Sequence, residues 1–282
     1  MTSLRLVDEE SAADLATYLA RARRVDEGGF VRLQAVGPVL AAWTCVLPGR
    51  GLTNSGLVLG LRTFALAKPT QRDLTVPIGA VTDRLARGGV ELQDPPVLAS
   101  PGWSAVSPPR SGWERVGQVP DTALQDHARD GIAEIARGVP EGAGSAAVAD
   151  LRARVWMRLT DTVPPVPAGT AFGLHALGFL RPAPEARAEV HALGPWTRVS
   201  TPRGCRHSTR RRSPTSSRPL TTRPRSSSRA PCVACAPTTA SSGRKAPRHL
   251  PAPAGPGSST RSTGPTTSSQ GSAPGAARSP CA

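Results

Sequence analysis

The sequence predicts an α+β fold: a small antiparallel sheet over about residues 30–76, packed helices, and a helical C-terminal half that ends in a β-hairpin before a disordered tail. Two patterns favour this class. Apolar residues alternate with a period of two within the sheet region and recur at helical spacing on either side of it. Because strands and helices fall in separate blocks with short loops between the strands, we expect antiparallel pairing.

A first helix is predicted from about residue 9 to residue 25. Ser11 and Asp14 have the spacing of a capping box, which predicts Ser11 as the N-cap. Gly28-Gly29 ends the helix. Its predicted inward face consists of residues at helical spacing, namely Leu15, Tyr18, Leu19, Ala22 and Val25.

The strands of the sheet are predicted next. Residues 30–36 alternate, and a Gly37-Pro38 interruption separates them from a nearly continuous apolar run at 39–47. A glycine-rich turn precedes a third strand at 57–66, and residues 73–76 predict a fourth. A helix then begins at Pro77 and ends before Gly88-Gly89.

The C-terminal half reads as helices followed by a hairpin. Helices are predicted at about 122–137, 145–160 and 169–180, the first two capped by Asp121 and Ser145. Their predicted inward residues include Ile132, Ile135, Val148, Val155 and Leu159. Two short strands at 188–193 and 196–201, joined at Gly194-Pro195, form the hairpin.

These elements predict four parts. Residues 1–91 form an α+β domain with an antiparallel meander, and residues 92–120 are an irregular connection rich in Pro and Gly. Residues 121–204 form a helical segment with a C-terminal hairpin, and residues 205–282 are a basic tail. The N-terminus lacks the pattern of a signal peptide, and no apolar run reaches about 18 residues, so we expect a cytoplasmic protein and no membrane partner.

The tail differs sharply in composition from the rest of the chain. All 20 acidic residues lie in residues 1–200 beside 21 of the 35 Lys and Arg, and the other 14 basic residues lie in 201–282. Of these 82 residues, 75 are Ser, Pro, Thr, Ala, Arg, Gly or Cys. Such a segment cannot bury enough apolar surface to offset its ordering entropy, so we expect it to be disordered.

The restricted set of residue types in the tail suggests how this segment arose. Every codon for those seven residue types has C or G in the middle position. In a GC-rich gene the third codon positions are almost all C or G, and a shift of one nucleotide moves them to the middle. The composition therefore predicts that residues from about 201–205 onward are read out of frame.

Two functional interpretations of the tail compete with that origin. Its Arg residues predict non-specific binding to nucleic acid through phosphates, although no repeat or interleaved aromatic residue accompanies them. Four side chains could bind zinc, but few apolar residues surround them; these are Cys205, His207, Cys232 and Cys235. We favour the out-of-frame origin over both of these interpretations.

Candidate catalytic and ligand sites in the first 200 residues are weak. Gly49-x-Gly51 and Gly142-x-Gly144-Ser145 each match part of a phosphate-binding loop, but neither completes one, and turn formation explains them better. Asp126, His127, Asp130 and Glu134 lie near one helix face that is more simply a solvated surface. We predict no catalytic, cofactor-binding or metal-binding residue and no cofactor.

Three residues that could carry chemistry have no partner at a useful spacing. His175 and His191 lack a metal-ligand neighbour in the sequence, and Cys45, in an apolar strand, reads as a buried thiol. A helix at 170–180 followed by a hairpin resembles the end of a winged-helix domain, whose recognition helix enters the major groove. That helix is apolar here, whereas base readout needs polar side chains.

Several segments resemble uncharacterised proteins of high-GC actinobacteria: residues 31–39, 42–45, 59–63 and 196–204. The resemblance covers nearly all of residues 1–204 and implies no activity, cofactor or site residue. We therefore expect a non-catalytic interaction or assembly module that binds an unknown protein partner or itself. A winged-helix-like DNA-binding regulator is the first alternative, and a small-molecule enzyme with a pocket covered by residues 92–120 is the second.

Overall fold

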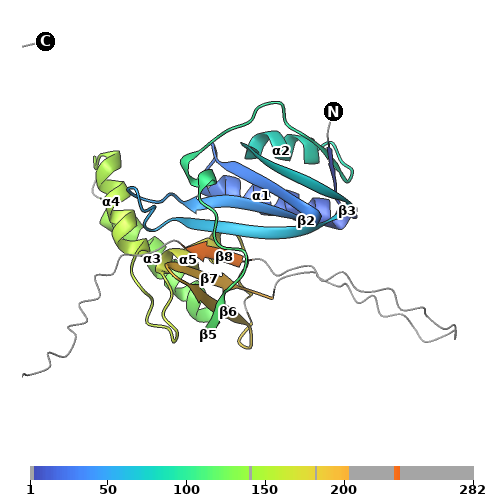
Figure 1. The fold of residues 1–282 in the computed structure, drawn as a ribbon. Coiled ribbons are helices and arrows are strands. Elements are labelled where there is room, and N and C mark those ends of the chain that lie inside the picture. Colours follow the sequence, from blue (N-terminus) through green and yellow to red (C-terminus); the bar gives the residue numbers. More distant parts are fainter. Residues whose placement is uncertain (1–2, 140–141, 182, 203–231, 236–282) are drawn as a thin grey trace, which may run out of the picture. The chain divides into compact units, whose positions relative to one another are not determined.

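The computed structural model describes residues 3–139, 142–181, 183–202 and 232–235 of the 282-residue chain. For the last of these segments only the backbone is described. The described residues form five α-helices and two antiparallel sheets, so the predicted α+β class is confirmed (Figure 1). None of the described helices is long and apolar enough to cross a membrane.

Helix α1 (Glu9–Val25) has the bounds that the sequence predicts, and four of its five predicted inward residues are buried. Its cap is different. Asp8, rather than Ser11, is the N-cap, and its carboxylate accepts a hydrogen bond from the Ser11 backbone N–H at 2.8 Å. Asp8 therefore satisfies one of the free N–H groups of the first turn, the capping role that the sequence predicts for Ser11.

Two long strands replace the four that the sequence suggests. Strand β2 (Phe30–Leu47) pairs with β3 (Val58–Pro77) along their length, from Phe30 opposite Pro77 to Leu47 opposite Val58. Gly37, with a φ of 59°, lies at a shift in register. Gly37 is opposite Thr70 whereas Val39 is opposite Ala65, and a shift in register by an odd number of residues reverses which side chains face inward.

The reversal is visible in the burial of β2. Before Gly37 the odd positions 31, 33 and 35 are buried, and after it the even positions 40, 42, 44 and 46 are buried. The other face of the later segment is covered as well, because Trp43 and Cys45 pack against Leu57 and Leu59. Covering on both faces explains why residues 39–47 look continuously apolar in the sequence.

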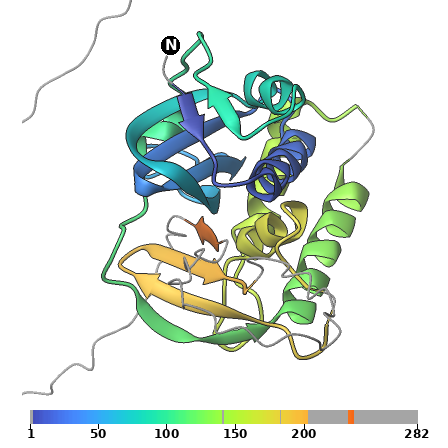
Figure 2. The ribbon, with the colours of Figure 1, turned by 90° about the vertical axis from the view of Figure 1, so that its right-hand side faces the viewer.

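The N-terminal half is completed by a second helix and a small sheet. Helix α2 (Ile78–Leu85) begins directly after β3, and strands β1 (Ser3–Arg5) and β4 (Glu91–Gln93) pair with each other. Helices α1 and α2 lie on the same side of the β2–β3 hairpin (Figure 2).

The C-terminal half contains the predicted hairpin and one strand that the sequence did not reveal. The hairpin strands pair around Gly194, and β5 pairs antiparallel with β6 (Figure 2). Only Val119 of β5 is buried, so the strand has no alternating pattern by which it could have been recognised. The elements are β5 (Glu114–Pro120), α3 (Asp121–Gly138), α4 (Ser145–Trp156), α5 (Ala168–Ala176), β6 (Arg187–Leu193) and β7 (Trp196–Ser200).

A strand from the tail completes the larger sheet. Strand β8 (Cys232–Cys235) pairs antiparallel with β3 on one side and with β7 on the other, in the order β2-β3-β8-β7-β6-β5. The expectation of a tail without secondary structure is therefore wrong for these four residues. The rest of the predicted disordered segment lies outside the described residues.

One contiguous core joins the two halves of the described chain. It contains buried side chains from α1, β2, β3, α3, α5, β6 and β7. At its centre Tyr18 stacks on Phe179 with ring centroids 5.9 Å apart, and the Tyr18 hydroxyl lies 2.8 Å from Thr44 Oγ1. Arg21 donates hydrogen bonds to the carbonyls of Leu177 and Gly178.

Replacing Gly60 should show how tightly this centre is packed. An added Cβ would clash with Leu177 Cδ1 and lie 3.2 Å from the Tyr18 hydroxyl, and Leu177 is itself fully buried. We expect Gly60→Ala to lower the free energy of unfolding by about 1–3 kcal/mol in urea denaturation because the core is overpacked. Gly79→Ala is the matched control, because its added Cβ meets nothing within 4 Å. Ala in place of Gly at a helical position raises the free energy of unfolding by up to about 1 kcal/mol. Equal stability of the two variants would contradict this account.

Candidate ligand cleft

A cleft of about 1100 Å³ lies among the described residues. Its walls come from the C-terminal end of α1, the turn between β2 and β3, and helices α3, α4 and α5. Pro101 and Trp103, from the connection between the two halves, also line it. Segments distant in the sequence therefore meet around one space, which is larger than most small-molecule pockets.

The lining of the cleft is largely apolar. Trp156 stacks on Phe172 with centroids 4.6 Å apart, and both rings lie in the wall. Ile132, Ile135 and Val148 line the cleft, although the helical spacing predicts them to face the core. Ile132 is 41% exposed, so this prediction is wrong for its side chain. The pattern identified apolar faces correctly but could not tell a packed core from an open cleft.

The charged residues of the cleft are mostly basic. Four arginines line it against a single carboxylate, Asp26. Two of the four are engaged, since Arg21 donates to backbone carbonyls and Arg50 pairs with Asp150. The other two, Arg24 and Arg152, are exposed and have no ion-pair partner among the described residues. The cleft therefore combines an apolar surface with free guanidinium groups.

Two lining residues could in principle carry chemistry. Burial raises the pKa of the Cys45 thiol to about 12, so at neutral pH it is a thiol and not the nucleophilic thiolate. Burial, and then the charge of Arg129, lower the pKa of His175, which keeps its imidazole neutral. Because Asp26 is the one lining carboxylate, the lining offers no carboxylate pair for acid–base work. These groups suit binding better than catalysis.

Both glycine-rich turns from the sequence lie at this cleft. Gly49 and Ser145 are both lining residues. The capping role predicted for Ser145 is wrong, because Gly144 is the N-cap of α4 and no side chain caps that helix. Juxtaposition of the two turns could not be inferred from either one alone.

Asp121 is likewise not the cap that the sequence suggests. Pro120 is the N-cap of α3, and the Asp121 carboxylate accepts a hydrogen bond from the Arg181 backbone N–H at 2.9 Å. Its side chain is buried, and burial raises its pKa against the opposing effect of Arg181. Asp121 therefore fixes the chain after α5 to the start of α3.

Of the four clustered residues of α3, Asp126, His127 and Glu134 are engaged in separate ion pairs, and Asp130 forms none among the described residues. His127 Nε2 lies 2.7 Å from Asp161, Glu134 forms two hydrogen bonds of 2.8 Å with Arg158, and Asp126 pairs with Arg129. No group of three His, Cys, Asp or Glu in the part of the chain that the structure describes could hold a metal ion. His191 lies on β6, where burial and Arg198 lower its pKa.

The possible zinc ligands of the tail are not brought together by any described contact. Cys205 and His207 lie outside the described residues, and only the backbone of Cys232 and Cys235 is described. The zinc hypothesis therefore remains a prediction.

The helix that the winged-helix alternative would place in the major groove is part of the interior. In α5 and the residues that follow it, the buried side chains include Thr170, Leu174, Leu177 and Phe179. The hairpin that follows is joined into the sheet between β5 and β8 and is not a free wing. In a winged-helix domain the recognition helix and the wing are both exposed to DNA, and neither element is exposed in that way here.

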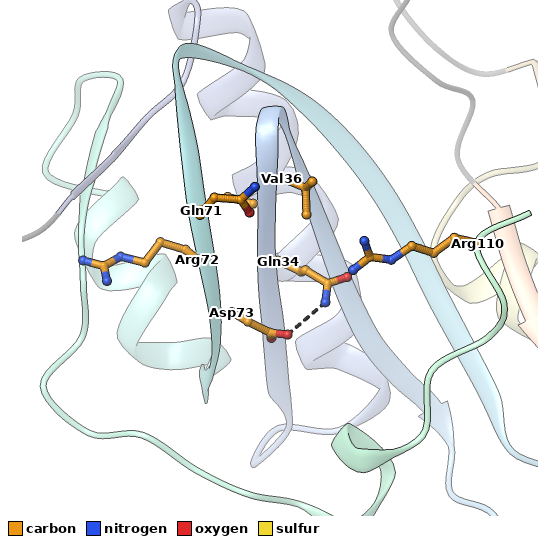
Figure 3. A pocket seen from close by; sticks show the side chains of 7 residues that line it. Gln34, Val36, Gln71, Arg72, Asp73 and Arg110 are labelled. Atoms are coloured by element: carbon orange, nitrogen blue, oxygen red, sulfur yellow. Dashed lines mark hydrogen bonds between the residues drawn. The ribbon is translucent and has the colours of Figure 1, made fainter.

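A second, shallow hollow lies over the β2–β3 hairpin, where Gln34, Asp73 and Arg110 face one another (Figure 3). Its central carboxylate is already satisfied. Asp73 accepts two hydrogen bonds from Arg32, at 2.6 and 2.7 Å, and one from Gln34 at 2.9 Å. Arg32 also donates to the Ser104 carbonyl, which ties the connection to the sheet. We interpret the contacts of Arg32 with Asp73 and with the Ser104 carbonyl as structural, and we call them the latch.

The latch should be sensitive to acid. The hydrogen bond from Arg32 lowers the pKa of Asp73, so its stabilising effect is present above the usual value of about 3.9 and is lost as pH falls through the lower folded value. In urea denaturation, Asp73→Asn should be less stable than wild type at pH 6 and should lose less stability between pH 6 and pH 3. Asp83→Asn removes an exposed carboxylate that has no described ion pair, and it should behave like wild type. Parallel pH profiles of Asp73→Asn and wild type would contradict the latch.

Two family models match the chain. Residues 1–105 match a domain of unknown function (DUF8010), and residues 108–213 match another domain of unknown function (DUF8185). The boundary between the matches falls within the Pro- and Gly-rich connection, and the second match extends past residue 204. No curated protein matches the chain. The chain is thus similar to two domain families whose descriptions assign no activity.

Proposed function

We propose that this protein is a non-catalytic binding module whose cleft takes a small molecule with an apolar body and an anionic group. The observation that carries the proposal is the combination of aromatic walls with four arginines and one carboxylate around about 1100 Å³. An interaction module remains the most general description, and the cleft gives it a ligand class.

Physical chemistry supports this ligand class. Burial of apolar ligand surface contributes about 25 cal/mol per Å², so a body of two or three rings supplies several kcal/mol before the costs of binding are subtracted. A guanidinium group next to an apolar wall binds carboxylate, sulfonate or phosphate oxygens through paired N–H donors. Arg24 and Arg152 are free to do so within the described structure. A neutral apolar ligand would leave them unused.

An enzyme acting on such a molecule is the second candidate. Pro101 and Trp103 come from the 92–120 connection and line the cleft, as that hypothesis expects. His175 could serve as a base there because burial keeps it neutral. It is the weaker candidate because the lining offers no activated nucleophile and no second acid–base carboxylate.

We also propose a cytoplasmic setting, a high-GC actinobacterial origin, and a tail read out of frame from about residues 201–205. The abrupt change in composition supports the frame proposal, and non-specific nucleic-acid binding by the Arg residues of the tail follows from charge alone. The nucleotide sequence of codons 195–215 tests the frame directly: a single intact frame across the junction rejects it. The domain division at residues 92–120 and self-association are likewise proposals.

The ligand class can be tested with two fluorescent probes of similar apolar body. The probe 1-anilinonaphthalene-8-sulfonate carries an anionic group, and N-phenyl-1-naphthylamine does not. We expect full-length protein to bind both, with the anionic probe bound at least tenfold more tightly. Comparable affinities would contradict a role for the arginines.

A matched pair of variants separates the cleft from the basic tail. Arg24→Gln with Arg152→Gln removes two lining cations, whereas Arg23→Gln with Arg154→Gln removes two exposed cations from the same helices outside the lining. We expect the first double variant to lose at least tenfold in affinity for the sulfonate probe and little for the neutral one, and the second to match wild type. Equal losses in both would place the binding on the tail or on general surface charge.

A further inference from the structure

The larger sheet contains a slot that is one strand wide. Strand β3 and strand β7 do not pair with each other, and the gap between them is closed by the four residues of β8 alone. In this slot Gly60 of β3 and Val199 of β7 both lie opposite Val233. Without β8, two strand edges with free N–H and C=O groups would face each other.

The walls of the slot are well ordered by packing. With β8 in place, Val58, Leu59 and Val199 are at most 1% exposed, and Trp43 and Trp196 pack against the pair Leu57 and Leu59. Helix α5 packs against both β3 and β8. Both sides of the slot are thus packed around β8, and what β8 supplies between them is an extended backbone.

The present occupant comes from far along the chain. Residues 201–231 separate β7 from β8, whereas β6 and β7 are joined by the two residues Gly194-Pro195. The occupant is also short, and a strand between two neighbours is held mainly by main-chain hydrogen bonds. Local opening of so short a strand requires less free energy than unfolding of the sheet around it.

We propose that the β3–β7 slot is a peptide-binding site that accepts an extended segment antiparallel to both strands, and that Cys232–Cys235 fills it as a displaceable plug. The ligand is an unstructured peptide of at least four residues with an unblocked backbone. It binds by adding its own strand to the sheet in place of β8.

The test uses the full chain and an opened slot. Val233→Pro removes a backbone donor at the centre of β8, and Thr239→Pro places a proline in the tail outside β8 as the control. The probe is a fluorescein-labelled peptide with the sequence of residues 230–237, kept reduced, beside the same peptide carrying an N-methylated valine. The second peptide has the same side chains but lacks the central N–H donor.

In fluorescence anisotropy we expect Val233→Pro to bind the first peptide at least tenfold more tightly than wild type or Thr239→Pro does. The N-methylated peptide should bind all three weakly. Equal affinity of the first peptide for wild type and Val233→Pro would overturn the proposal, as would tight binding of the N-methylated peptide.

Two measurements guard against a variant that fails to fold. If Val233→Pro alone is unfolded, the first peptide should restore its circular dichroism spectrum, and failure to do so would count against the slot. In wild type, the amides of residues 58–61 and 197–200 should exchange at least tenfold more slowly than those of the turn at 51–55. Exchange as fast as the turn would show the slot to be open, and a concentration-dependent dimer that Val233→Pro abolishes would make a second copy the occupant; either result overturns the intramolecular plug.

Discussion

The arrangement of the two halves depends on the contacts around Tyr18. Its ring stacks on Phe179 from the C-terminal half, and its hydroxyl is paired with Thr44 of β2. A buried hydroxyl without a partner costs about 1–3 kcal/mol, so this hydrogen bond fixes where α1 lies on the sheet. The missing side chain of Gly60 leaves room for Leu177 to pack against the same place. One residue of α1 thereby sets the distance between the sheet and the end of α5.

The cleft follows from that constraint. Because α5 is held close to β2 and β3, its outward residues Phe172 and His175 face the space between α1 and α4. Among the described residues, no further layer covers the apolar residues of α3 and α4 that line the same space. Exposed arginines therefore lie beside apolar surface. This combination suits a ligand that has both an apolar body and an anionic group. The position of α5 on the sheet therefore accounts both for the packed core around Tyr18 and for the cleft beside it.

Sequence patterns predicted the parts of this fold that depend on local periodicity. Helix α1 and the final hairpin repeat a stripe or an alternation over many residues, and both were found within a residue or two. The bulge at Gly37 could not be predicted because the shift in register there reverses the inward face, which makes one long strand look like two. Strand β5 escaped because its exposed residues do not alternate. The cleft could not be predicted, because its walls come from both halves and an uncovered helix face has the same pattern as a buried one.

Strand β8 shows the limit of arguments from composition. Residues 201–282 lack the apolar side chains for a core, and that remains a sound reason to expect no independent domain there. A strand that enters an existing sheet needs no core of its own, since its neighbours already supply the packed layers and it contributes main-chain donors and acceptors. The ordering cost of four residues is about 4–8 kcal/mol, which a backbone paired on both sides can meet where a free segment cannot. A tail unable to fold by itself can therefore still complete the sheet, because the site that receives it is defined by β3 and β7 and not by the tail.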